Sequence, residues 1–285
     1  MDNLPKYGPI DVVFSFCSYI LESVKIIDAH VHLGSWPNIE TSKANLLYGM
    51  NAYGIASGIL SHADCSTFPG DAGAFATPIS AAEGLRQCIE FAREHPGRFH
   101  LAVWIKPLVE PRPSEELFSL IRDNRDLIVA LKLHPFCERI SPCDERLEPY
   151  YELAAELNMP VLCHTALDFH SSIGELILAA NAHPNLRFVA AHLELSSDHH
   201  YSINALKSTK NVYADTAWVD MKSARLAMEE VGVDRVMFGT DSPLDGPETL
   251  ANPLYFSFLN NTEHLPEDIY ERLMSGNAKA FYGID

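Results

Sequence analysis

Short apolar runs that alternate with helix-like segments constrain the fold of this chain more than any other feature of its sequence. The runs lie near Lys25–His32, Gly54–His62, Phe99–Lys106, Leu127–His134, Pro160–His164, Leu186–His192, Val212–Thr216 and Arg235–Asp241. Between them, longer segments predict helices at Ile79–His95, Ser114–Arg122, Arg146–Leu157, Ser172–Ala182 and Lys222–Val231. Asn158-Met159-Pro160 is a helix stop directly before a strand.

Eight strands that alternate with helices predict an α/β fold, the closed parallel TIM (β/α)8 barrel. An open doubly wound sheet is the other arrangement, but no Gly-rich phosphate turn follows the first apolar run. The 285 residues suit one domain, because a barrel of this kind runs to roughly 250 residues. We expect a single barrel over residues 25–285. Residues 1–24 form an N-terminal extension that we expect to be helical, since 10–24 are apolar with few charges.

The charge of the chain excludes several classes of partner. Its formal net charge is −17 and no basic cluster offsets it, so the surface repels nucleic acid and anionic membranes. No run of about 18 apolar residues predicts a membrane span, and no basic region precedes the N-terminal apolar stretch as in a signal peptide. None of the six cysteines forms a CxxC pair, which predicts free thiols. We therefore expect a cytoplasmic protein.

The first apolar run ends in Asp28-Ala29-His30-Val31-His32. Because side chains alternate along a strand, Asp28, His30 and His32 are expected on one face. Two imidazoles on one face at a strand end are a pair of metal ligands. The alternative is a pair of hydrogen-bonded core histidines, which is costly to satisfy where a metal ion would satisfy both nitrogens.

Later strands also end in metal-competent groups, and the C-terminal strand ends of a barrel meet at one face. His164 is expected as a third ligand. Asp241 is expected both to bind metal and to take a proton from water, unless it only caps the following helix. His192 is either a further ligand or a group that polarises a substrate carbonyl, and we favour the second role. Strict alternation places Phe188 and Ala190 on the face of His192, toward the barrel interior.

Lys132 and His134 end the fourth run and are expected to bind substrate. Lys132 could hold a substrate carboxylate or be a buried ion-pair partner. It could also be carboxylated and bridge two metal ions. His134, which precedes Pro135, is expected to line the substrate pocket.

Together these segments resemble the amidohydrolase superfamily, and within it the amidohydrolase-related subgroup, or amidohydrolase family 2. The opening Ile27-Asp28-Ala29-His30-Val31-His32 is similar to the superfamily signature. The subgroup is resembled at Leu131-Lys132-Leu133-His134-Pro135, Cys163-His164-Thr165, Ala191-His192, Met237-Phe238-Gly239-Thr240-Asp241-Ser242-Pro243 and the closing Ser275-Gly276-Asn277-Ala278-Lys279-Ala280-Phe281-Tyr282-Gly283.

The resemblance implies a TIM barrel that holds a divalent metal, usually zinc. The positions that match the family's ligands are His30, His32, His164 and Asp241. His192 matches the catalytic histidine. The Lys-Leu-His-Pro pattern suits the mononuclear subgroup, so we expect one Zn²⁺, with Mn²⁺ or a second metal as alternatives.

The main prediction is a metal-dependent hydrolase that cleaves an ester, lactone or amide of a small molecule. Substrates with a carboxylate and substrates without one both fit this prediction. The alternative is a non-oxidative decarboxylase of an aromatic or unsaturated acid on the same metal site. That reaction needs a cationic pocket, for which Lys132 and Arg139 are candidates. A barrel that binds metal or ligand without chemistry is the third hypothesis. The resemblance and the apolar N-terminal segment favour a homodimer.

Overall fold

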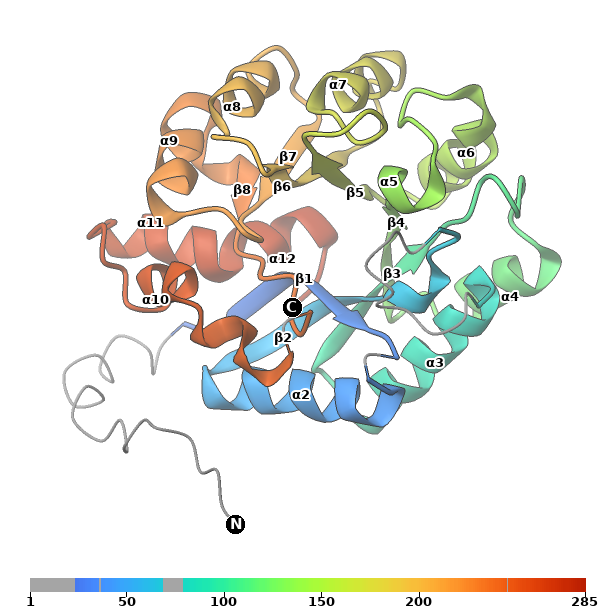
Figure 1. Cartoon of the computed structure of the whole chain (residues 1–285), viewed down its shortest axis with the longest axis horizontal. Helices are drawn as coiled ribbons and strands as arrows, with labels where there is room; N and C mark the ends of the chain where they lie inside the picture. Colours follow the sequence, from blue (N-terminus) through green and yellow to red (C-terminus); the bar gives the residue numbers. More distant parts are fainter. Residues whose placement is uncertain (1–23, 36, 69–78, 245) are drawn as a thin grey trace.

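Eight parallel strands form a ring that is surrounded by helices, and the predicted TIM barrel is confirmed (Figure 1). The computed structural model describes residues 24–35, 37–68, 79–244 and 246–285. The strands are β1 (Ile26–Leu33), β2 (Ile55–His62), β3 (Phe99–Trp104), β4 (Ile128–Leu133), β5 (Val161–Ala166), β6 (Phe188–Leu195), β7 (Val212–Asp215) and β8 (Val236–Met237). Each pairs with the next in chain order, so the sequence prediction of all eight strands holds to within a few residues.

The barrel closes between its first and last strands through backbone hydrogen bonds, although the regular part of β8 has only two residues. Ala29 N donates to Phe238 O at 2.8 Å. Farther along, Asp241 N donates to His30 O and His32 N donates to Ser242 O, each at 2.8 Å. We call this line of contacts the β1–β8 seam.

Helices cover the outside of the ring. They are α2 (Ile39–Ala52), α3 (Ala81–Glu94), α4 (Glu115–Asp123), α5 (Pro135–Glu138), α6 (Glu148–Glu156), α7 (Ile173–Ala182), α8 (His200–Leu206), α9 (Met221–Val231), α10 (Pro253–Leu259), α11 (Glu267–Glu271) and α12 (Asn277–Tyr282). Shorter turns are η1 (Ala63–Cys65), η2 (Glu145–Leu147), η3 (Val233–Arg235), η4 (Gly246–Ala251) and the π-helical η5 (Arg272–Gly276).

Serine caps explain where several of the helices begin. Ser80, Ser114 and Ser172 each accept a hydrogen bond from the backbone N–H three residues later, which satisfies a donor that the first helical turn leaves free. The five helices predicted from the sequence are confirmed as α3, α4, α6, α7 and α9, with boundaries shifted by a few residues.

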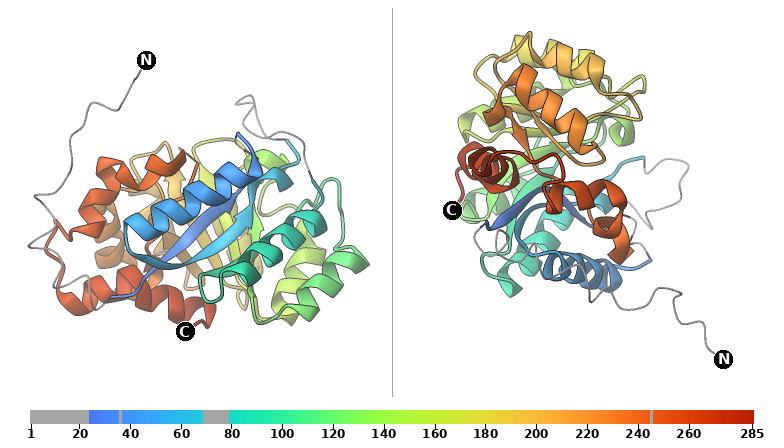
Figure 2. Two further views of the ribbon diagram at one scale, coloured as in Figure 1. Left: turned by 90° about the horizontal axis from the view of Figure 1, so that it is seen from below. Right: turned by 90° about the vertical axis from the view of Figure 1, so that its left-hand side faces the viewer.

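Apolar side chains fill two separate layers. The outer layer lies between the strands and the helices, whereas the inner layer fills the barrel itself. The strand residues of the inner layer mix alanines with larger side chains: Ile27, Ala29, Ile59, Ala102, Ala130, Leu162, Val189, Ala191 and Met237. Helix α12 joins this layer through Ala278, Phe281 and Tyr282, and it lies across the end of the barrel where the strands begin (Figure 2). The opposite end, where the strands finish, is left for polar groups.

Strict alternation is wrong at three strands. In β6, Phe188 and Ala190 lie in the outer layer, and Val189 and Ala191 lie in the inner one. The prediction that Phe188 and Ala190 point into the barrel together with His192 is therefore wrong. In β1 the pairing with β2 is irregular between Asp28 and Val31. Asp28 lies between two inner-layer residues and bonds Thr240 and the His30 N–H, so it does not share the face of the two histidines. In β4, Ile128 lies in the outer layer and Ala130 in the inner one, although alternation would place both on one face.

Three further sequence predictions concern the N-terminal extension, the cysteines and the absence of a membrane-spanning helix. The N-terminal extension predicted as helical lies outside the described residues, apart from Val24, which packs against the outer layer. The described cysteines carry no disulfide, and Cys163 packs in the outer layer. Among the helices of the described residues, none combines the length and the apolar character needed to cross a membrane.

Candidate metal centre

His30 and His32, at the end of β1, turn their Nε2 atoms toward each other at a distance of 3.2 Å. Each ring is oriented through its other nitrogen. His30 Nδ1 donates to Asp215 Oδ2 at 3.0 Å, and His32 Nδ1 lies 3.0 Å from Ser61 Oγ. A carboxylate only accepts, so the His30 proton resides on Nδ1 and the Nε2 lone pair faces the barrel mouth.

Asp241 completes this arrangement from the segment that follows β8. Its Oδ1 lies 2.9 Å from His32 Nε2 and 3.3 Å from His30 Nε2, and both atoms belong to groups predicted as ligands. Its Oδ2 accepts a hydrogen bond from the indole Nε1 of Trp218 at 3.0 Å. The sequence prediction that the ends of the first and last strands meet in one site agrees with this placement.

His192 reaches the same place by leaving regular strand geometry. His192, Leu193 and Glu194 have φ of 69°, 45° and 69°, a left-handed run that few non-glycine residues adopt. This turn, rather than alternation, brings the ring inward. His192 Nδ1 donates to Ala217 O at 3.1 Å, which leaves Nε2 for the cluster. Among the described residues, ligand atoms of His30, His192 and Asp241 lie within 4.8 Å of one another.

Glu194 holds this turn in place. It is buried, and its carboxylate accepts from the N–H of Ile173 at the start of α7 and from Ser202 Oγ. Its own N–H donates to Thr165 Oγ1 at 2.8 Å. Glu194 is thus a structural anchor and not part of the metal centre.

Asp215, at the end of β7, was not singled out by the sequence analysis although it organises the site. It is fully buried. Besides accepting from His30, its Oδ1 accepts from the backbone N–H groups of His192 and Ala217 at 3.0 and 3.1 Å. The one signal in the sequence was a carboxylate at the end of a buried strand. Trp218 gave no signal at all.

Burial and neighbouring charges set the protonation of these groups. Burial, assisted by Lys132, lowers the pKa of His30 to about 4, and burial also lowers the pKa of His32. Burial alone would raise the pKa of Asp241, but His30 and His32 hold it well below its usual range. Asp215 behaves in the same way, because His30 outweighs the effect of burial on its pKa. Near neutral pH His30 and His32 are therefore neutral and Asp215 and Asp241 are ionised, the states in which imidazoles and carboxylates bind metals.

The chemistry of these atoms fits a divalent metal. His30 Nε2, His32 Nε2 and Asp241 Oδ1 are 2.9–3.3 Å apart. His32 Nε2 donates to Asp241 Oδ1, and moving that proton to His32 Nδ1, beside Ser61 Oγ, would turn three lone pairs toward the space they share. Ligands about 2.0–2.2 Å from a tetrahedral zinc ion are separated by about 3.3–3.6 Å. A carboxylate behind a ligating histidine, as Asp215 is behind His30, is a common feature of such sites.

The remaining predicted residues form one wall beside the centre. His134 stacks on His164 with ring centroids 3.8 Å apart, and Trp104 stacks on the other side of His134 at 5.4 Å. His164 meets His192 edge-on at 4.8 Å, so it lies beside the centre, outside the group formed by His30, His192 and Asp241. Burial lowers the pKa of His134 and His164 well below the usual range.

Lys132 lies fully buried inside the barrel, with Nζ 2.7 Å from His30 Nε2. Burial lowers the pKa of this lysine. Arg139, the second cationic candidate, is exposed and packs over the ring of Phe68 at 4.2 Å. Lys132 is therefore the cation that lies at the centre, and Arg139 is not placed there.

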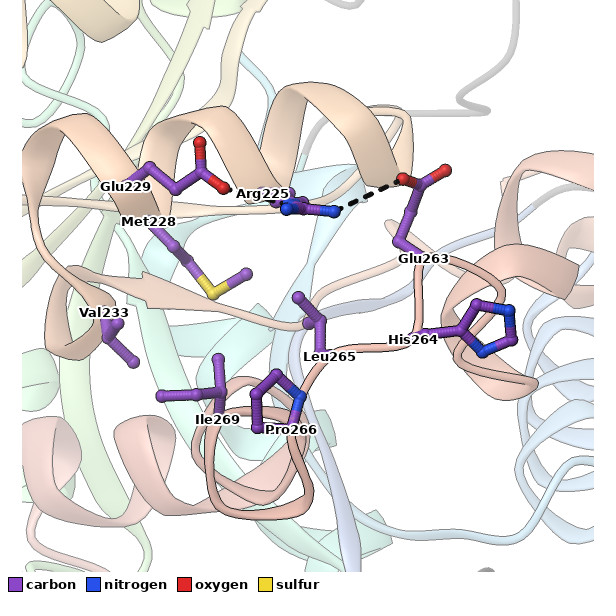
Figure 3. Close-up of a pocket in the computed structure, with 9 residues that line it drawn as sticks. All are labelled: Arg225, Met228, Glu229, Val233, Glu263, His264, Leu265, Pro266 and Ile269. Carbon is purple, nitrogen blue, oxygen red and sulfur yellow. Dashed lines mark hydrogen bonds and ion pairs between the residues drawn. The ribbon is translucent and has the colours of Figure 1, made fainter.

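A separate groove lies between α9 and the segment leading into α11 (Figure 3). Apolar side chains of Met228, Leu265 and Ile269 line it, and Arg225 lies at its rim between two glutamates. None of the predicted site residues takes part in it.

A TIM barrel with histidines and a carboxylate gathered where its strands end defines a class of metal-dependent barrel enzymes. The chain belongs to the amidohydrolase family, whose sequence model matches residues 27–284. The resemblance seen in the motifs is thereby confirmed. A comparison with curated proteins gives no match.

Solved structures with the same fold include several decarboxylases. The 5-carboxyvanillate decarboxylase from Sphingomonas paucimobilis has a TM-score of 0.67 at 14% identity, covering 92% of this chain and 100% of that one. The 2,6-dihydroxybenzoate decarboxylase from Rhizobium has a TM-score of 0.63 at 15% identity, covering 91% and 99%. The 5-carboxyvanillate decarboxylase from Novosphingobium aromaticivorans, complexed with manganese, has a TM-score of 0.66 at 12% identity, covering 92% and 97%. At these identities the likeness shows the shared fold.

Proposed function

We propose that this protein is a metal-dependent enzyme that removes carbon dioxide from an aromatic or unsaturated carboxylic acid without oxidation. The observation that carries the proposal is the position of Lys132, a buried cation at the candidate metal centre, beside a wall of stacked rings. The decarboxylases among the structural relatives support this reading over hydrolysis.

The residues that would hold the metal are His30, His32 and Asp241, with His192 or His164 as a further ligand. A divalent ion there would anchor substrate oxygens and stabilise negative charge that develops during the reaction. One zinc ion is our prediction from the sequence, with Mn²⁺ as the alternative, and the manganese bound in relatives of the same fold supports that alternative. A small carboxylate as substrate, a cytoplasmic location and a homodimer are further proposals.

Lys132 is suited to hold the substrate's carboxylate. Its ammonium now shares the His30 Nε2 lone pair, the same one that a metal ligand must offer. Once His30 serves as a ligand, Lys132 loses that acceptor, and a substrate anion would replace it. A buried ammonium without an anionic partner is costly, so the exchange favours a negatively charged substrate.

The stacked rings of Trp104, His134 and His164 are suited to a planar substrate. The ring centroids are 5.4 and 3.8 Å apart in a face-to-face stack, so an unsaturated ring could pack against the edges or an outer face of this stack. His134 and Lys132 end the same strand, so the rings and the cation are fixed relative to each other.

In the reaction, the bond between the substrate carbon and its carboxylate breaks and its electron pair stays on that carbon. Carbon dioxide leaves, and a proton takes its place. His192 is our candidate to carry that proton, because its Nδ1 is bonded to Ala217 O and its Nε2 faces the centre. An imidazole fixed through one nitrogen can exchange a proton through the other.

Hydrolysis of an ester, lactone or amide is the second candidate, and the ionised state of Asp241 favours it. A carboxylate that stays ionised near neutral pH can accept a proton from water that attacks a carbonyl. His192 would then polarise the carbonyl, as the sequence prediction has it.

The test is a panel of hydroxybenzoates, unsaturated acids and lactones with the protein loaded with zinc or manganese. Decarboxylation releases carbon dioxide, whereas hydrolysis releases only a new acid. The variant Lys132→Met should raise KM for a carboxylate substrate by about 10- to 100-fold, the loss of one charged hydrogen bond. Acid release from lactones with no carbon dioxide from any acid would overturn the proposal in favour of hydrolysis.

A further inference from the structure

The two oxygens of Asp241 have different surroundings. Oδ1 faces His32 Nε2 and His30 Nε2, whereas Oδ2 is bonded to the indole N–H of Trp218 at 3.0 Å. An indole N–H is only a donor, so this contact uses one of the two lone-pair sites of Oδ2. Oδ1 is thus the oxygen that faces the two histidines, and the carboxylate cannot rotate to present Oδ2 in its place without breaking the bond to Trp218.

Trp218 is itself held in an unfavourable backbone conformation. Its φ is 60°, in the left-handed region where a large side chain costs about 1–2 kcal/mol. Such a conformation persists only where the surroundings impose it. The Trp218 N–H donates to the hydroxyl of Tyr255 at 3.0 Å, and that hydroxyl donates to Thr240 O at 2.6 Å.

These contacts form a closed loop. Thr240 is the chain neighbour of Asp241, so Tyr255 joins the backbone beside Trp218 to the backbone beside the carboxylate. The side chains of Trp218 and Asp241 are joined directly by the bond from the indole N–H to Oδ2. Tyr255 is fully buried and its ring meets that of Trp218 edge-on at 6.1 Å. The indole is thereby fixed against Oδ2 from two sides.

We propose that Trp218 is a positioning residue that makes Asp241 a one-oxygen ligand and so keeps a coordination position free for substrate. The proposal rests on the metal centre of the proposed function. A merely structural Trp218 would fill space in the loop after β7 and would not alter how a bound metal is coordinated.

Cobalt(II) provides the test, because its visible absorption is intense in four-coordinate sites and weak in six-coordinate ones. Apo-protein, prepared with a chelator, is titrated with Co²⁺ as wild type and as Trp218→Phe. Phenylalanine retains a ring but has no donor, so Asp241 can bind through both oxygens and the coordination number rises. We expect the visible bands to lose intensity in Trp218→Phe.

Trp104→Phe is the matched control. Trp104 is the other indole described at the site, and its N–H donates to Glu138 rather than to the centre. Its cobalt spectrum should match that of the wild type. If Trp218→Phe does not fold, Tyr255→Phe removes the hydroxyl that fixes Trp218 but leaves the indole N–H, and it should show a smaller loss of intensity in the same direction.

The outcomes separate the inference from the function. A wild-type protein that binds no cobalt overturns the metal centre and, with it, the inference. A wild type that binds cobalt and a Trp218→Phe spectrum identical to it overturn the inference alone. Equal losses in Trp218→Phe and Trp104→Phe also overturn it, because they would reflect packing and not the bond to Asp241.

Discussion

Replacing Asp215 with asparagine should weaken metal binding even though Asp215 is not itself a ligand. Its Oδ1 accepts two backbone N–H groups, from His192 and Ala217, so the amide oxygen of asparagine must take that side. The amide NH₂ then faces His30 Nδ1, which is 3.0 Å from the present Oδ2. A donor at that position forces the His30 proton onto Nε2, the atom that should ligate.

The size of the effect follows from these contacts. Loss of a carboxylate behind a ligating histidine costs about 10- to 100-fold in metal affinity. The bond lost is one buried hydrogen bond to a charged group, worth about 1.5–3 kcal/mol of folding stability. The two backbone bonds to Oδ1 are retained, so the fold itself should survive.

Competition with a chromogenic chelator measures the zinc affinity, and urea denaturation of the apo-protein measures stability. Asp220→Asn is the matched control, because Asp220 caps α9 in the same β7–α9 connection and contacts neither histidine. Asparagine caps helices about as well as aspartate, so this variant should keep both its stability and its metal affinity. If Asp215→Asn binds zinc within about twofold of the wild type, the reasoning about the His30 tautomer is wrong.

Three other predictions concern residues that are not proposed as ligands. Burial raises the pKa of Asp28 from 3.8 to about 7, so the folded protein keeps a proton that the unfolded chain releases. The free energy of unfolding of the wild type, relative to that of Asp28→Asn, should therefore fall by up to about 4 kcal/mol as the pH rises from about 4 to 7. If urea denaturation gives the same difference between the two proteins at pH 5 and at pH 8, this prediction is wrong. A Cβ at Gly84 would overlap Cys65 Sγ, so Gly84→Ala should lower the stability of the fold by about 1–3 kcal/mol. The loss should be smaller in the double variant with Cys65→Ala. If thermal denaturation gives the same loss with and without Cys65→Ala, the overlap is not its cause. Glu194→Gln should lower stability by about 1.5–3 kcal/mol, because a buried carboxylate holds both α7 and Ser202, and an unchanged urea midpoint would refute its anchoring role.

The barrel could be predicted from the sequence because each strand is a short apolar run with a polar end. The inner and outer layers are both apolar, so the runs stand out whichever way their side chains point. His30, His32 and Asp241 follow the same logic, since strands of one parallel barrel must end at one face.

Which face each side chain takes could not be predicted so well. His192 lies in the centre because three consecutive residues adopt a left-handed backbone, and none of them is glycine. Asp28 leaves the face of its neighbours at an irregularity in β1. Asp215 and Trp218 act on residues far away in the chain, and one aspartate or tryptophan in a sequence carries no sign of its distant partner.

The β1–β8 seam also bears on how the chain folds, because proposed metal ligands lie on both sides of it. His32 and Asp241 are 209 positions apart, and they lie on opposite sides of the last junction that the ring must make. Closing so long a loop is slow, because its entropy is lost before its contacts are gained. An ion bound by His30, His32 and Asp241 would cross-link β1 to the segment after β8. Without the ion, amide hydrogen exchange in the barrel should therefore be fastest along the β1–β8 seam.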